Sequence, residues 1–239
     1  MSLPVLLAAP VFVKFSLPHL AVMALTLLVP LVLSVWVRKT GERAPTRQIA
    51  IAAAVVLLTA RFGHSVVLAP EHPWTTLLPF HLCDIAMFAV ILALGGRGRL
   101  SFDIAYFFGL AATLQGVLTP NIPFDFPHPR FFTYFVWHCG IVIFDLYLVF
   151  GLKKRPTVRS LWQCYAWLHV YAIVAGAINF LLSANYGYLR DKPTGGSVMD
   201  HFGEWPFYII GLSLFALVSF WIFYLPFGVA NLIRKHKKK

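Results

Sequence analysis

Charged residues are scarce in this chain, and acidic residues are the scarcest among them. Asp, Glu, Lys and Arg together make up 12% of the 239 residues, and only 9 residues are acidic. Soluble domains carry roughly 25% charged residues. Hydrophobic residues, in contrast, make up 59% of the chain. This balance excludes a soluble globular domain and indicates a membrane protein.

Cysteine is also scarce, and the chain offers no basis for a disulfide framework. Its 3 cysteines all lie inside apolar stretches, where oxidative pairing of loops is not expected. We interpret Cys139 and Cys164 as buried structural residues. A basic segment ahead of the first apolar residues is missing, so no cleavable signal peptide is predicted. Residues 1–17, which Pro4 and Pro10 interrupt, are expected to lie at the membrane interface.

Long apolar runs dominate the rest of the chain. A helix of about 20 apolar residues crosses a bilayer, and 7 such runs are present. We therefore predict an all-α polytopic membrane protein, a bundle of 7 transmembrane helices that forms a single domain over residues 1–239. The predicted spans are about 19–37, 48–68, 75–95, 101–119, 131–151, 160–183 and 206–230.

The net charge of +11 is placed in a way that predicts orientation rather than nucleic-acid binding. Of the 20 basic residues, 15 follow the first, third, fifth or seventh span: Arg38, Lys39, Arg43, Arg47, Arg97, Arg99, Lys153, Lys154, Arg155, Arg159, Arg234, Lys235, Lys237, Lys238 and Lys239. Basic loops of membrane proteins face the cytoplasm. The N-terminus is thus predicted outside and the C-terminus in the cytoplasm, in the plasma membrane of a prokaryote or an endomembrane of a eukaryote. No nucleic-acid partner is expected.

Polar side chains lie at a similar depth in several spans, always toward the predicted outer end. Such side chains are costly in lipid and are rare there unless they face a packed or wet interior. One layer of them predicts a buried site near the outer face. Its members are Arg61, His64, His81, Cys83, Asp84, Gln115, His138 and Asn179.

A cysteine and a histidine lie at the centre of this layer. Cys83 and His138 each lie about 7 residues into a span that enters from outside, which is roughly 10 Å of helix. A buried thiol is inert, whereas an imidazole that takes its proton leaves a thiolate nucleophile. We predict Cys83 as the nucleophile and His138 as the base, with His81 and Asp84 as flanking, orienting groups. The alternative for Cys83 is a small buried hydrophobic residue.

Four further polar residues of the layer suggest binding roles. Arg61 and His64 share one face of the second span. Arg61 either extends to the membrane interface or joins His64 in binding a lipid phosphate. Gln115 and Asn179 are candidates to donate a hydrogen bond to a developing oxyanion, and interhelical hydrogen bonding is the alternative for Asn179. The long connection 184–205 is expected to be a binding loop or a solvated linker.

Several stretches resemble the YwaF-like integral membrane proteins, a family related to transmembrane protein 164. They are Pro79-Phe80-His81-Leu82-Cys83-Asp84; Phe126-Pro127-His128-Pro129 with His138; Asn185-Tyr186-Gly187-Tyr188-Leu189-Arg190-Asp191-Lys192-Pro193; and Asp200-His201-Phe202-Gly203-Glu204-Trp205-Pro206. Eukaryotic relatives are lipid acyltransferases that remodel ether phospholipids through an acyl-cysteine. The resemblance implies that Cys83 is the nucleophile and His138 its partner.

We therefore predict a lipid acyltransferase or lipid acyl hydrolase that acts on membrane phospholipids through a Cys83 thioester and needs no metal or cofactor. Three alternatives stay open. A zinc-dependent intramembrane hydrolase would gather ligands such as His81, Asp84 and His138, although no ligand-spacing motif is present. A haem or quinone protein would pair His138 with His169 across helices, although their depths differ. A lipid-binding or transport protein would need no chemistry, and the chain has no internal repeat typical of transporters.

Overall fold

Helices make up nearly all regular structure in residues 10–41, 43–194 and 196–237, the part of the chain that this computed structural model describes. Of the interfacial segment predicted over residues 1–17, residues 1–9 lie outside that range. The elements in chain order are α1 (Leu17–Thr40), α2 (Arg43–Leu68), α3 (Trp74–Leu77), α4 (Leu82–Leu94), α5 (Arg99–Phe108), η2 (Gly109–Thr113), α6 (Leu114–Leu118), α7 (Pro129–Phe150), α8 (Val158–Leu182), η3 (Tyr186–Tyr188), η4 (Val198–Phe202) and α9 (Phe207–His236).

Among the described residues, 6 helical segments are long and apolar enough to cross a membrane. They are Leu17–Thr40, Thr46–Leu68, Arg99–Leu118, Pro129–Phe150, Val158–Leu182 and Phe207–Arg234. Each lies within a few residues of a predicted span, because the length of an apolar run largely decides where a membrane helix begins and ends. Large apolar side chains are exposed along the outer faces of α1, α8 and α9, which suits contact with lipid. The all-helical membrane fold is confirmed.

The third span was predicted as one continuous helix over 75–95, and the structure differs from this prediction. Its residues are divided between α3 and the 13-residue helix α4. Leu78 is extended, with φ −66° and ψ 150°, and Pro79 follows it without an N–H to continue a helix. Cys83 is therefore the second residue of α4 and lies at a helix N-terminus.

The fourth span contains a π-helical segment, η2, between α5 and α6. At Gly109, where this segment begins, an added Cβ would lie 1.8 Å from Asp145 Oδ2 of α7. The glycine thus permits the close approach of η2 to α7. A π-helical turn inserts extra residues into a helix and frequently occurs at functional sites. Here it changes the direction in which the side chains that follow it point.

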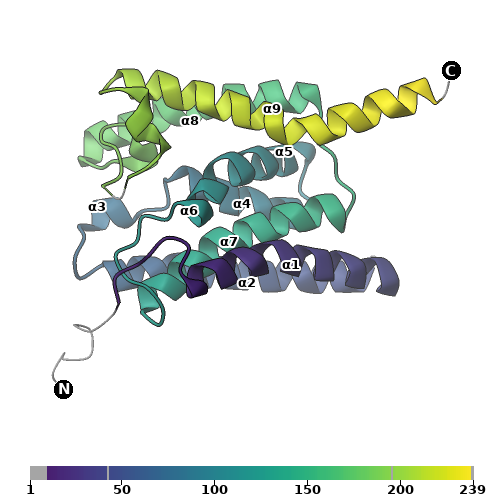
Figure 1. Ribbon diagram of the computed structural model, residues 1–239, viewed down its shortest axis with the longest axis horizontal. Coiled ribbons are helices and arrows are strands. Elements are labelled where there is room, and N and C mark those ends of the chain that lie inside the picture. The colour runs from purple at the N-terminus through teal and green to yellow at the C-terminus, as the bar shows by residue number, and fades with distance from the viewer. Residues whose placement is uncertain (1–9, 42, 195, 238–239) are drawn as a thin grey trace.

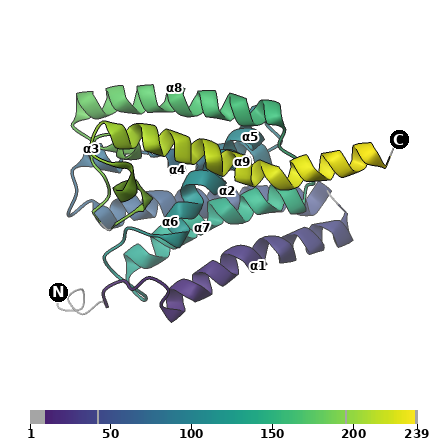
Figure 2. The same cartoon turned by 45° about the horizontal axis from the view of Figure 1, so that its top comes forward.

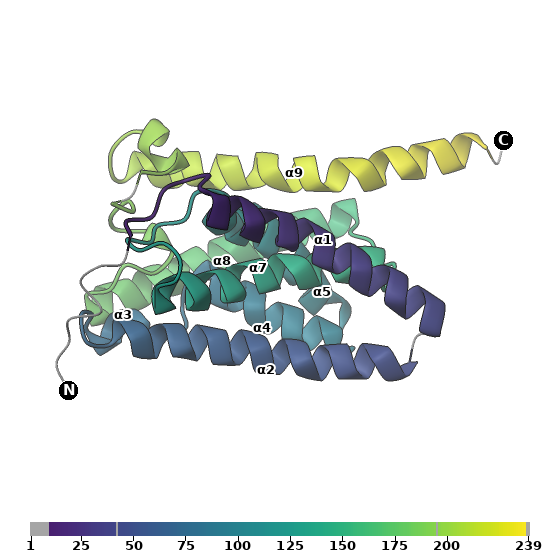
Figure 3. The same cartoon turned by 60° about the horizontal axis from the view of Figure 1, so that its bottom comes forward.

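The helices are arranged in layers, as Figure 1 shows. α8 and α9 lie on one side of the molecule, α1 and α2 on the other, and α4, α5 and α6 between them. α7 packs against both α1 and α2. Figures 2 and 3 show that α3 lies at the end of the bundle where α1 begins, and that α9 carries the C-terminus to the opposite end.

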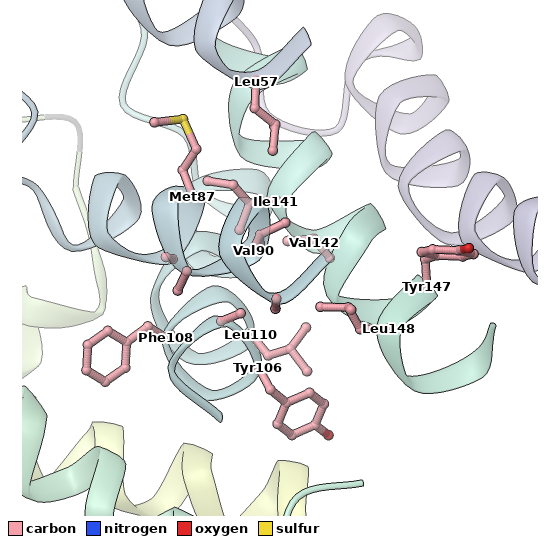
Figure 4. Close-up of a cluster of buried hydrophobic side chains, with 14 of the residues drawn as sticks. Leu57, Met87, Val90, Tyr106, Phe108, Leu110, Ile141, Val142, Tyr147 and Leu148 are labelled. Carbon is pink, nitrogen blue, oxygen red and sulfur yellow. The ribbon is translucent and has the colours of Figure 1, made fainter. Parts of the chain in front are cut away.

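The short helix α4 lies at the centre of the apolar core. Its Met87 and Val90 are fully buried among Leu57 of α2, Leu110 of η2 and Ile141 of α7 (Figure 4). A helix that is apolar on every face is stable only where other elements surround it. The core therefore holds α4 on several sides and fixes the position of its N-terminus.

A buried ion pair also fixes the start of α4. Arg61 Nε of α2 donates to Asp84 Oδ1, and the two side chains are only 4% and 0% exposed. Asp84 Oδ2 accepts the backbone N–H of His81 at 2.9 Å. Arg61 Nη2 donates to the carbonyl oxygens of Leu77 and Leu78 at 3.1 and 3.2 Å. The pair thus ties α2 to both sides of the break between α3 and α4.

Removing one member of this ion pair is expected to destabilise the fold strongly. Asp84→Ala leaves the Arg61 guanidinium buried without its counter-charge, and such changes cost about 3–5 kcal/mol. The double change Arg61→Met/Asp84→Leu removes both charges and is expected to recover most of that loss. Thermal unfolding in detergent measures both effects.

The control for this prediction is the ion pair of Lys192 with Glu204, where the glutamate side chain is 94% exposed. Glu204→Ala is expected to cost less than about 1 kcal/mol, because solvent screens such a pair. An Asp84→Ala protein that unfolds at the same temperature as Glu204→Ala would contradict the role assigned to the buried pair.

Candidate functional site

A cavity of about 940 Å³ opens between the α8–α9 layer and the rest of the bundle. Ligand pockets usually measure roughly 300–1,000 Å³, so this cavity has room for a large molecule. Its wall includes residues of α2, α4, η2, α6, α7, α8 and α9. Most of the polar layer predicted from the sequence lies on it, namely Arg61, His64, His81, Cys83, Gln115 and His138.

The cavity is polar at one end and apolar at the other. Along α9 its lining extends from Ile209 to Phe220, about 16 Å of helix. The residues farthest from the loops are mostly apolar and include Phe108 and Phe220, and His169 is a polar exception. His72 and Arg130 line the other end, to which the connection 184–205 also contributes. This division matches a molecule with a polar head and an apolar chain.

Cys83 is half-buried on the cavity wall. The Thr113 hydroxyl of η2 lies beside the thiol and makes no hydrogen bond to any residue of the described part of the chain. Tyr134, Tyr171 and Tyr188 all lie close enough to the thiol to interact with it electrostatically. The amides at the start of α4 favour a negative charge on the sulfur, whereas the apolar surroundings oppose it. A nucleophilic Cys83 therefore needs a base.

His138 is held in a defined orientation by its own helix. Its Nδ1 lies 2.9 Å from the carbonyl oxygen of Tyr134. A carbonyl oxygen only accepts, so Nδ1 carries the hydrogen and Nε2 of the neutral ring has a free lone pair. The Tyr134 ring stacks on the imidazole, with centroids 4.0 Å apart. Tyr134 thus contacts His138 and also interacts with Cys83.

Arg61 does not extend to the membrane interface, which was one of its two interpretations. It is 3% exposed, and its guanidinium is held by Asp84, by Ser65 Oγ and by main-chain carbonyls. It also lies 4.9 Å from the centroid of the Trp137 ring. Asp84 is fully buried behind the cavity wall. Both residues therefore orient the N-terminus of α4, where Cys83 lies.

His81 and His64 lie on the same wall with different contacts. The His81 ring packs edge-on against Tyr186, with centroids 5.2 Å apart. His64 Nδ1 lies 2.9 Å from Thr133 Oγ1. The Thr133 hydroxyl donates its hydrogen to the carbonyl oxygen of Pro129 at 3.0 Å, so His64 Nδ1 is the donor to Thr133. Nε2 of His64 remains available to a ligand.

Asn179 holds the loop after α8 instead of facing the cavity. Its Nδ2 donates to the Tyr186 carbonyl oxygen at 2.9 Å, and its Oδ1 accepts the Tyr186 N–H at 2.6 Å. Both the donor and the acceptor of the amide are thus bonded to the main chain, which favours a structural role for Asn179. Gln115, the other amide of the layer, does line the cavity. The connection 184–205 also contributes to the wall through η3 and Ser197, as expected of a binding loop.

Thr113, beside the thiol, and Arg130, on the cavity wall, were not identified from the sequence. Thr113 gave no signal, because only the π-helical segment brings its hydroxyl beside Cys83. Arg130 did give a signal in the sequence, since it is one of the 5 basic residues that lie outside the predicted cytoplasmic segments and so are not explained by membrane orientation. These residues are Lys14, Arg61, Arg130, Arg190 and Lys192.

The side chains that the zinc hypothesis needs do not converge on one point among the described residues. Within residues 10–41, 43–194 and 196–237, no three His, Cys, Asp or Glu side chains lie close enough together to hold a metal ion. The haem or quinone pairing is not supported either, because His169 makes its contacts with α8 and α9. Its Nδ1 lies 2.8 Å from the Tyr165 carbonyl oxygen and its Nε2 3.1 Å from Ser213 Oγ.

Comparison with protein families identifies one match over most of the chain. The model of the TMEM164 family matches residues 14–224, which include every cavity residue named above. Neither the curated proteins nor the solved structures gave a match.

Gly116→Ala is expected to disturb the candidate site by moving His138. A Cβ at this position would lie 2.8 Å from His138 Cδ2 and 3.1 Å from Tyr134 Oη, and overpacking of this kind typically costs about 1–3 kcal/mol. With Cys139 and Cys164 replaced by alanine, we expect alkylation of Cys83 by iodoacetamide to slow by about tenfold, the equivalent of 1.4 kcal/mol.

Gly176→Ala is the matched control, because an added Cβ there meets no atom within 4 Å. It is expected to leave the alkylation rate unchanged. Equal rates for Gly116→Ala and the wild type would mean that His138 does not assist the Cys83 thiol.

Proposed function

Since the chain belongs to the TMEM164 family, we propose that it is a membrane-embedded lipid acyltransferase or lipid acyl hydrolase that forms a thioester on Cys83. One observation carries the proposal: Cys83 and His138 line the same cavity, which is polar at one end and apolar at the other. A phospholipid is divided in the same way, and its ester bonds lie between its polar and apolar parts. An acyl chain in the apolar end would bring an ester toward the thiol.

In the proposed reaction, His138 Nε2 takes the proton of the Cys83 thiol as the sulfur attacks the ester carbonyl carbon. The tetrahedral intermediate collapses with cleavage of the ester C–O bond. The leaving alkoxide takes the proton back from His138 and departs as a lysolipid. The acyl group is then bound to Cys83 as a thioester. The hydroxyl of an acceptor lysolipid, or water, attacks that thioester, and His138 returns the acceptor's proton to the sulfur.

The other residues of the polar layer support these steps in the proposal. The side-chain amide of Gln115, which lines the cavity, is the donor proposed for the developing oxyanion. His64 Nε2 is the proposed partner of a lipid phosphate. Arg61 and Asp84 position the start of α4, and so the thiol, and take no direct part in the chemistry.

We propose that the polar end of the cavity faces the outer side of the membrane and that α4 is a seventh membrane-embedded helix. The orientation rests on charge. Arg38 and Lys39 occupy the last turn of α1, the end of that helix away from the cavity loops. The connections 95–98 and 151–157 lie at that same end of the bundle and are also basic. The C-terminus would then be cytoplasmic.

The orientation predicts which side of the membrane each loop occupies. In a variant without native cysteines, Lys14→Cys is expected to react with a membrane-impermeant maleimide on intact cells. Lys153→Cys is expected to react only after the cells are opened. Both lysines are exposed, so accessibility to the reagent depends on the side of the membrane alone. The reverse labelling pattern would overturn the orientation.

The thioester predicts a covalent adduct of defined behaviour. After incubation with phospholipid, the intact mass of the wild-type protein is expected to increase by one acyl group, and hydroxylamine is expected to remove it. Cys83→Ala should carry no adduct. His138→Ala should carry much less, because general-base assistance typically contributes a factor of about 10²–10⁴.

Cys139→Ala is the control for the mass measurement, since this buried cysteine is expected to play no part and its variant should carry the wild-type adduct. A wild-type protein that binds phospholipid but never carries an adduct would overturn the thioester. It would leave a lipid-binding or transport protein. Stoichiometric zinc or a copurifying chromophore would instead assign the polar layer to a cofactor.

A further inference from the structure

Arg130 is a buried cation whose counter-charge comes from outside the core. The residue lies in the first turn of α7, is 5% exposed and lines the cavity. Its Nη2 lies 2.5 Å from Glu71 Oε2, and the Glu71 side chain is 60% exposed on the loop after α2. The Arg130 guanidinium beside Glu71 holds the pKa of that carboxyl below its usual range. An oxyanion therefore already occupies one edge of this guanidinium.

Arg61, the other arginine on the cavity wall, is bound differently. Its partner Asp84 is fully buried, and its remaining N–H groups are directed to Ser65 and to main-chain carbonyls. An anion that bound Arg61 would have to displace groups that hold α4 in place. An anion that binds Arg130 has to displace only an exposed carboxylate, which water then solvates. Of the two arginines, Arg130 is the one available to a ligand.

The surroundings of Arg130 favour an anion. Within the described residues the cavity wall carries two arginines and 5 histidines and no Asp or Glu. Both His64 and His72 belong to this wall, and the Arg130 guanidinium acts electrostatically on His64. Thr133 connects His64 to the first turn of α7, because its Oγ1 accepts from His64 and lies 3.4 Å from the Arg130 carbonyl oxygen.

We propose that Arg130, together with His64, binds the phosphate of a phospholipid or lysophospholipid headgroup, and that Glu71 occupies this position until the phosphate replaces it. A planar guanidinium can form two parallel hydrogen bonds to phosphate oxygens, just as it can to a carboxylate. That the ligand is a lipid rests on the proposed function, since inorganic phosphate offers the guanidinium the same phosphate oxygens as a lipid headgroup does. The apolar end of the cavity favours the lipid.

The test measures binding rather than chemistry. Native mass spectrometry of the full chain in neutral detergent, in a Cys83→Ala background, gives the affinity for lysophosphatidylcholine, for a monoacylglycerol with the same acyl chain, and for inorganic phosphate. We expect Arg130→Gln to weaken lysophosphatidylcholine binding at least tenfold, and Arg130→Lys to weaken it less. Monoacylglycerol binding should not change. Glu71→Gln should strengthen lysophosphatidylcholine binding, because the competing carboxylate is gone.

Arg190→Gln is the matched control, since Arg190 is exposed, lies at the same end of the bundle and is absent from the cavity wall. It should bind like the parent protein. Equal weakening by Arg130→Gln and Arg190→Gln would indicate a general charge effect and overturn the proposal. If Arg130→Gln does not fold, Glu71→Gln decides, and an unchanged affinity in that variant overturns the proposal as well.

The remaining outcomes separate this proposal from the proposed function. Binding of inorganic phosphate alone, lost in Arg130→Gln, would keep the anion site and overturn the lipid as its ligand. Lipid binding that depends on Arg130, in a protein that forms no acyl adduct, would support the headgroup site and overturn the thioester chemistry. An acyl adduct in a protein whose lipid binding ignores Arg130 would overturn the headgroup site alone.

Discussion

The ion pair of Arg61 and Asp84 is the interaction on which the candidate site depends. Two opposite charges are buried at the point where the chain breaks between α3 and α4, and each also satisfies main-chain groups there. Separating the two charges would leave each of them unpaired in an apolar interior, and this cost keeps the pair together. The first residues of α4, Cys83 among them, are therefore placed by electrostatics, whereas the rest of that helix is placed by apolar packing.

Most of the fold could be predicted from the sequence, because bilayer thickness fixes the length of apolar runs. The six long spans are where hydrophobicity placed them. The third span was predicted as one helix, since residues 82 to 94 are apolar apart from Asp84 and the short run before them is also largely apolar. Pro79 was visible, but the sequence does not show that Arg61 supplies donors to the carbonyls that the break leaves free.

The candidate site was predictable in membership more than in geometry. Depth along a helix can be counted, so Cys83 and His138 were assigned to one layer, and both line one cavity. Rotation about a helix axis cannot be counted once a π-helical segment or a loop intervenes. Thr113 and Gly116 lie beside the thiol and the imidazole only because η2 turns them there. Asn179 has the right depth, but its amide is used by the loop that follows. The catalytic roles of Cys83 and His138 themselves stay predictions.

The two arginines of the cavity show how the location of a counter-ion separates structural from ligand-binding charge. Both guanidiniums are almost fully buried, and burial alone would make each costly unless it is paired. Asp84 shares the burial of Arg61, so neither charge gains by leaving the other. Glu71 loses little on leaving Arg130, because it is exposed to solvent, and Arg130 loses nothing if another oxyanion takes that place. The described wall of the cavity carries no acidic residue, so the charge of Arg130 is balanced by Glu71, which lies at the opening of the cavity. An amphiphile that brings its own negative charge to that opening, and an apolar chain to the other end, complements both halves of the cavity at once.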